Sequence, residues 1–85
     1  MSQSFRLIAA KGIQNGVFRL WYGATDNDQS PVVLTLTAQY VANALHKALP
    51  VSLEEMEEYA EEHEEWLLAV ARDTRACGHT AKVLT

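Results

Sequence analysis

The chain has 85 residues, 48% of them hydrophobic and 21% charged, and its formal net charge is −4. A chain of this length supports one hydrophobic core, and its composition is that of a globular domain, which excludes a multidomain or a disordered protein. The 7 basic and 11 acidic residues argue against general nucleic-acid binding, because that affinity comes mostly from Lys and Arg at phosphates. We therefore expect a single α+β domain over residues 1–85.

The sequence also bears on where the protein is located. No apolar run approaches the roughly 20 residues of a membrane-spanning helix, so we expect no membrane binding. The first residues lack the basic and then apolar pattern of a secretory signal. Cys77 is the single cysteine, whereas small secreted domains usually carry several disulfides. These features predict a cytoplasmic protein.

Three β-strands are predicted in the first half of the chain. Residues 4–10 and 17–22 alternate as strands, and Asn15–Gly16 between them is the strongest short hairpin signal. A polar loop over residues 23–31 leads to a third, β-branched strand over residues 32–36.

The first predicted helix follows the third strand directly. Thr37 is a suitable N-cap, and apolar residues recur at helical spacing as far as Leu49. Pro50 then ends the segment.

A second, longer helix begins at the capping box formed by Ser52 and Glu55, and Gly78 is placed to stop it. Its apolar stripe consists of Leu53, Met56, Ala60, His63, Leu67, Val70, Thr74 and Cys77. About 25 helical residues span about 38 Å, whereas strands of this size span about 17–23 Å. The helix should overhang the sheet, so its apolar stripe needs a further cover from the first helix, the final strand or a second copy of the chain. We expect the second copy, in a homodimer.

The expected fold is a three-stranded antiparallel sheet packed on two helices, and residues 81–84 are able to add a short fourth strand. This order of elements resembles that of many small bacterial and phage proteins, although no motif assigns the chain to one family.

Strict alternation divides the strand residues between two faces of the sheet. The face toward the helices is expected to carry Phe5, Leu7, Ala9, Phe18, Leu20, Tyr22, Val32, Leu34 and Leu36. The other face would carry Arg6, Ile8, Val17, Arg19, Trp21, Val33 and Thr35, which is apolar for a solvated surface. Because Trp and Arg are enriched at the centres of protein interfaces, Trp21 with Arg6 and Arg19 is the predicted protein-binding patch. Alternatively, Trp21 packs on Ile8 and the arginine stems, or one strand is out of register by one residue.

The second helix also carries eight glutamates between Glu54 and Glu65, with no Lys or Arg among them. Helical spacing places Glu54, Glu58, Glu61 and Glu65 on one face, where the like charges repel. One interpretation is a solvated face whose acids complement the helix dipole. The alternative is an anionic ridge for a basic protein partner. Such a ridge would imitate nucleic-acid phosphates and inhibit a basic nucleic-acid-handling protein, by analogy with small acidic proteins of mobile elements.

No catalytic, cofactor-binding or metal-binding site is predicted. His63 has no second ligand one helical turn away, so we expect a packed histidine with one hydrogen-bond partner. Cys77 and His79 are close in sequence, but a helix C-terminus disfavours the thiolate. The four glycines form no phosphate-binding loop. We therefore expect a non-enzymatic protein. The alternative is a small enzyme that uses His63, Cys77 or His79 with distant residues and encloses a pocket near one of them.

Overall fold

The computed structural model describes residues 5–14, 16–24 and 30–85, with the side chains of residues 13 and 14 left out. Asn15 of the predicted hairpin and residues 25–29 of the predicted loop lie outside these ranges. The elements in chain order are β1 (Arg6–Gln14), β2 (Val17–Gly23), β3 (Val32–Thr37), α1 (Ala38–Ala44), α2 (Leu53–Glu62), α3 (Glu64–Ala76) and β4 (Ala81–Leu84).

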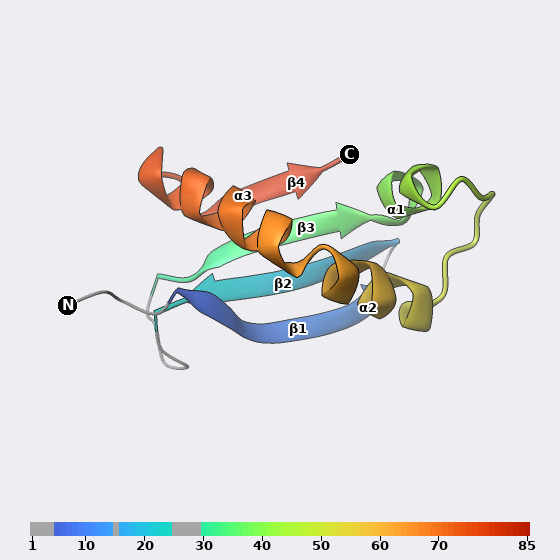
Figure 1. Cartoon of the computed structure of the whole chain (residues 1–85), viewed down its shortest axis with the longest axis horizontal. Helices are drawn as coiled ribbons and strands as arrows, with labels where there is room; N and C mark the ends of the chain where they lie inside the picture. The colour runs from blue at the N-terminus through green and yellow to red at the C-terminus, as the bar shows by residue number, and fades with distance from the viewer. Residues whose placement is uncertain (1–4, 15, 25–29) are drawn as a thin grey trace.

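The strands form one sheet in the order β1-β2-β3-β4 (Figure 1). The β1-β2 and β2-β3 pairs are antiparallel, as predicted, and the fold belongs to the α+β class. β4 pairs with β3 in parallel, so the sheet is mixed. A parallel neighbour requires a crossover connection, and the three helices between β3 and β4 provide it by returning the chain to the end of the sheet where β3 begins.

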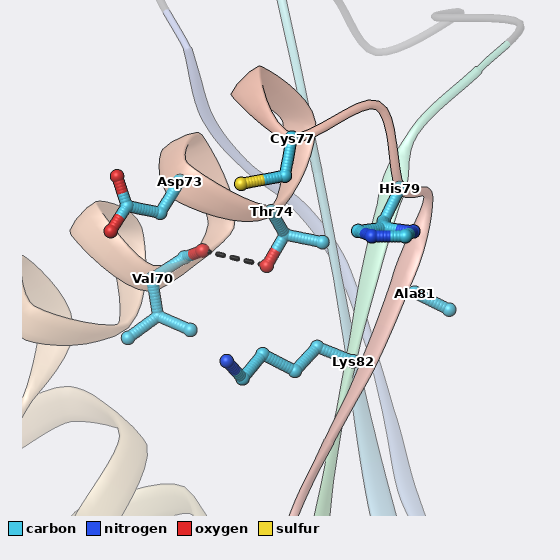
Figure 2. A pocket seen from close by; sticks show the side chains of 7 residues that line it. All are labelled: Val70, Asp73, Thr74, Cys77, His79, Ala81 and Lys82. Atoms are coloured by element: carbon cyan, nitrogen blue, oxygen red, sulfur yellow. Dashed lines mark hydrogen bonds between the residues drawn. The ribbon is translucent and has the colours of Figure 1, made fainter.

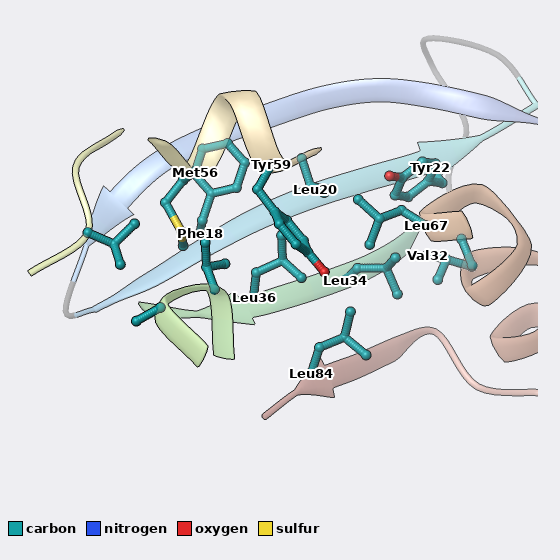
Figure 3. Close-up of a cluster of buried hydrophobic side chains, with 14 residues drawn as sticks. Phe18, Leu20, Tyr22, Val32, Leu34, Leu36, Met56, Tyr59, Leu67 and Leu84 are labelled. Carbon is teal, nitrogen blue, oxygen red and sulfur yellow. The ribbon is translucent and has the colours of Figure 1, made fainter. Parts of the chain in front are cut away.

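Helices α2 and α3 lie across one face of the sheet and enclose the core (Figures 1 and 3). The core consists of Phe18, Leu20, Tyr22, Val32, Leu34, Leu36, Val41, Ala42, Val51, Met56, Tyr59, Leu67, Ala71 and Leu84. The alternation predicted for β2 and β3 is confirmed, because their six members of this set are all buried. Over the described ranges, no helix has the length and apolarity needed to span a membrane.

The first helix is shorter than the sequence predicted, since α1 ends at Ala44 and not at Leu49. The Thr37 hydroxyl accepts a hydrogen bond from the Tyr40 amide, which confirms the predicted N-cap. At the other end, His46 has φ = 55°, and the Lys47 amide donates to the Ala42 carbonyl. The left-handed His46 and the hydrogen bond from Lys47 to Ala42 together form a Schellman motif. This motif ends α1 before the apolar periodicity of the sequence ends.

The predicted long helix is two helices that meet at His63. His63 has φ = −111° and ψ = 28°, outside helical geometry. Of the predicted stripe, Met56, Leu67 and Thr74 are buried, whereas Leu53, His63 and Cys77 are exposed. Tyr59, which the stripe did not include, is buried as well. Because α2 and α3 have 10 and 13 residues, the single helix of about 25 residues from which the overhang was inferred does not form. The homodimer expectation loses that reason.

The predicted start and end of this helical segment are confirmed. Ser52 and Glu55 form a reciprocal capping box in which each side chain accepts a hydrogen bond from the other's backbone amide. Gly78 has φ = 80° and follows the last turn of α3, while the His79 amide donates to the Thr74 carbonyl. Local capping therefore determines both ends of the segment. It does not account for the break at His63 between them.

Candidate functional site

The face of the sheet opposite α2 and α3 will be called the open sheet face. Strand register places on it Arg6, Ala9, Lys11, Val17, Arg19, Trp21, Val33, Thr35, Ala81 and Val83. Trp21 lies directly between Ala9 and Val33, and Ala81 continues the same row on β4. Because its row is otherwise small or β-branched, Trp21 is the largest side chain there and offers a broad apolar contact.

Cations flank Trp21 in both directions along the strands. Arg19 is exposed and pairs with Lys11 and Thr35 in the next row of the open sheet face. Arg6 is exposed on the other side, opposite Gly23. Each arginine row lies two strand residues from the Trp21 row, a separation of about 7 Å. The structure thus places Arg6, Arg19 and Trp21 on one surface.

A β-bulge in β1 adds a cation that sequence reasoning missed. Leu7 pairs with Tyr22 and Ala9 pairs with Trp21, so two residues of β1 cover one residue of β2. Strict alternation placed Ala9 under the helices, and that prediction was wrong because the bulge reverses the facing of the residues after it. Lys11 consequently lies on the open sheet face. The sequence signal was the run from Leu7 to Ala10, four apolar residues that do not alternate.

The second predicted surface, the acidic helical surface, is formed by the outer sides of α2 and α3. Its exposed members are Glu54, Glu57, Glu58, Glu61, Glu62, Glu64 and Glu65. Glu54, Glu58 and Glu61 share α2, but Glu65 belongs to α3, so the predicted four-residue ridge is interrupted at His63. The eighth glutamate, Glu55, forms an ion pair with Lys47. The hydrogen bond from Lys47 is the main reason why the pKa of Glu55 is lowered, and the Ser52 amide adds to it.

His63 lies at the break and is exposed, not packed on the core as predicted. Its ring stacks on Tyr59 with centroids 4.3 Å apart, and Nδ1 lies 3.0 Å from the Tyr59 carbonyl oxygen. When Nδ1 carries a proton, it donates to that carbonyl. His63 therefore has the one hydrogen-bond partner that was predicted, and its contacts fit a structural role at the helix break.

Cys77 and His79 line an open pocket of about 430 Å³ between α3 and β4 (Figure 2). Asp73 and Lys82 contribute a carboxylate and an ammonium group to its walls, and Figure 2 shows the Lys82 side chain extending from β4 toward α3. The Thr74 hydroxyl is not available there, because it donates to the Val70 carbonyl at 2.8 Å. His63 lies far along the chain at the other end of α3, so the structure unites only two of the three residues of the enzyme alternative.

Among the residues that the structure describes, no three His, Cys, Asp or Glu side chains are grouped so that they could hold a metal ion. Cys77 is a free and exposed cysteine.

Comparison with protein-family models, curated proteins and solved structures gave no match to this chain.

Proposed function

We propose that this chain is a non-enzymatic protein-interaction domain that forms a homodimer through the open sheet face. The observation that carries the proposal is the position of Trp21 between Ala9 and Val33 on a face opposite α2 and α3. A half-exposed sheet face with a tryptophan, three valines and flanking arginines has the composition of an interface centre, where aromatic residues and Arg contribute most of the binding energy.

The arrangement of charges on this face is compatible with a symmetric dimer. A two-fold axis parallel to the strands would stack β1 and β2 of one copy on β4 and β3 of the other. Trp21 would then pack on the second copy's Val33, while Lys11 would face its Val83. The basic residues lie on β1 and β2 and the facing strands β3 and β4 carry neutral residues on this face, so no like charges would oppose one another.

The test is the molar mass in solution as a function of concentration, by light scattering and sedimentation equilibrium. The wild-type chain should show a concentration-dependent dimer, and Trp21→Ala should be monomeric with an unchanged circular dichroism spectrum. Trp66→Ala is the matched control, because Trp66 is an exposed tryptophan on α3 in the helical layer. A wild-type chain that is monomeric throughout, or a Trp21→Ala variant that dimerises like Trp66→Ala, would overturn the proposal.

A second function is favoured by the acidic helical surface. Its seven exposed glutamates form no ion pair with any cation in the described part of the chain, which leaves an uncompensated negative field. Such a surface would attract a basic protein, and it would do so most strongly at low salt. This alternative is an acidic inhibitor that occupies the nucleic-acid-binding surface of its target.

This second function predicts a specific pattern of capture. A basic nucleic-acid-binding protein should be retained by the immobilised chain at low salt and released by high salt or by added DNA. A variant with Glu54, Glu58, Glu61 and Glu65 replaced by Gln should lose the capture, whereas Trp21→Ala should retain it. Capture that resists both salt and the glutamine substitutions would refute the electrostatic mechanism.

A further inference from the structure

A second pocket lies on the other side of the helical layer, between β1, β2 and the junction of α2 with α3. Its volume is about 310 Å³, at the small end of ligand-binding pockets. Its apolar wall is formed by Leu7, Ala10, Phe18, Leu20, Tyr22 and Ala60, and its rim by Glu57, Glu61 and Glu64. Leu7 is 44% exposed although it points to the helix side of the sheet, so α2 leaves this part of β1 uncovered.

The Tyr22 hydroxyl is the polar group in the apolar wall. Tyr22 is only 2% exposed, and in the described ranges its hydroxyl forms no hydrogen bond. Every fully buried side-chain oxygen or nitrogen of the described residues has a hydrogen-bond partner. The Tyr22 hydroxyl oxygen has none in this part of the chain and is therefore not fully buried, and Tyr22 lines this pocket. A buried tyrosine normally uses its hydroxyl in a hydrogen bond. Its partner is therefore to be sought in the pocket.

The rim determines the charge of a suitable ligand. Glu57, Glu61 and Glu64 are exposed carboxylates without an ion-pair partner in the part of the chain that the structure describes. Burial raises the pKa of Tyr22 to about 12, and the negative charge of Glu64 contributes to the same shift by disfavouring the phenolate. The hydroxyl thus stays neutral and can accept a hydrogen bond. An apolar wall beneath three carboxylates is complementary to a cation on a short apolar body.

We propose that this pocket binds a small organic amine in its protonated form. The apolar body of the amine would lie against Leu7 and Leu20, the ammonium group would lie between Glu57 and Glu64, and one N–H would donate to the Tyr22 hydroxyl oxygen. This site is separate from the open sheet face, so the inference does not depend on the proposed homodimer.

The test uses three indole compounds of similar shape and different charge: tryptamine, the alcohol tryptophol and the anion indolepropionate. Binding is followed by backbone amide chemical shifts of the isotope-labelled chain. Tryptamine should perturb the amides of Leu7, Ala10 and Ala60 and bind about tenfold more tightly than tryptophol, because only the amine forms charge-assisted hydrogen bonds. Indolepropionate should not bind. Equal affinity of tryptamine and tryptophol, or shifts confined to other surfaces, would overturn the proposal.

Paired variants separate this pocket from general attraction to the acidic helical surface. Glu57→Gln with Glu64→Gln removes two rim carboxylates and should weaken tryptamine binding about tenfold. Glu58→Gln with Glu62→Gln removes the same charge from residues that line a different pocket beside Lys47, and it should change affinity less than about twofold. Equal losses of tryptamine affinity in the two double variants would show nonspecific attraction and contradict a defined site. Tyr22→Phe should weaken the binding of tryptamine. This variant should still bind tryptophol more tightly than indolepropionate.

Discussion

Ala9 of β1 lies directly opposite Trp21 of β2, although Leu7, two residues earlier, lies opposite Tyr22, the neighbour of Trp21. The extra residue at this bulge turns Lys11 to the open sheet face and Ala10 to the helix side, where it lines the amine pocket. One irregularity in an edge strand therefore shapes both proposed binding surfaces.

The bulge predicts which deletion the sheet tolerates. Removing Ile8 would restore simple alternation, with Leu7 and Ala10 still on the helix side, so we expect a folded chain that loses less than about 2 kcal/mol. Deletion of Thr35 from β3, which pairs with β2 without a register shift, would turn half of that strand over and should abolish cooperative unfolding. Urea unfolding of both variants measures the difference, and equal losses would contradict the bulge.

Core burial predicts a second contrast. Leu34 has no exposed surface and Val83 is 57% exposed. Leu34→Ala should lower the free energy of unfolding by about 2–5 kcal/mol, because it leaves a cavity beneath the helices. Val83→Ala should change it by less than about 1 kcal/mol. The measurement is urea unfolding of both variants in the Trp21→Ala background, which we expect to be monomeric, so that association does not contribute to the result.

The left-handed residues at the ends of α1 and α3 predict two substitutions with opposite effects on stability. Gly78 has φ = 80°, and a Cβ built there meets no atom within 4 Å, so Gly78→Ala should cost about 1 kcal/mol from backbone strain alone. His46 has φ = 55°, so His46→Gly should remove such strain and stabilise the chain by up to about 1 kcal/mol. Thermal and urea unfolding report both changes. A stabilising Gly78→Ala would be inconsistent with the left-handed turn at the end of α3.

Tyr22 predicts a loss of stability at alkaline pH. Its pKa is raised from 10.0 to about 12 in the folded state, so folding favours the neutral phenol. The corresponding stability is fully present below pH 10 and is lost as the pH rises toward about 12, because the unfolded state ionises first. Tyr22→Phe removes this group, so the variant should lose less stability than the wild-type chain over that interval. Parallel profiles of unfolding free energy against pH would contradict the assignment.

Much of this fold is determined by short-range features of the sequence. Alternation in β2 and β3 identifies their core residues, Thr37 and Ser52 mark two helix starts, and Gly78 marks the end of α3. Each of these signals acts within a few residues, through side-chain alternation, a capping hydrogen bond or a left-handed backbone angle. The placement of Arg6, Arg19 and Trp21 on one face followed from the same alternation.

Tertiary structure decided the bulge, the helix break and the parallel pairing of β4. Local periodicity continues through His63, yet the helical layer bends there and Tyr59 takes the buried position on the sheet. β4 joins the sheet only after three helices have returned the chain beside β3, and Lys11 changes face only when β1 pairs with β2. These outcomes depend on contacts between segments that are distant in the sequence. Such contacts stabilise the fold enough to override the geometry that the local sequence favours.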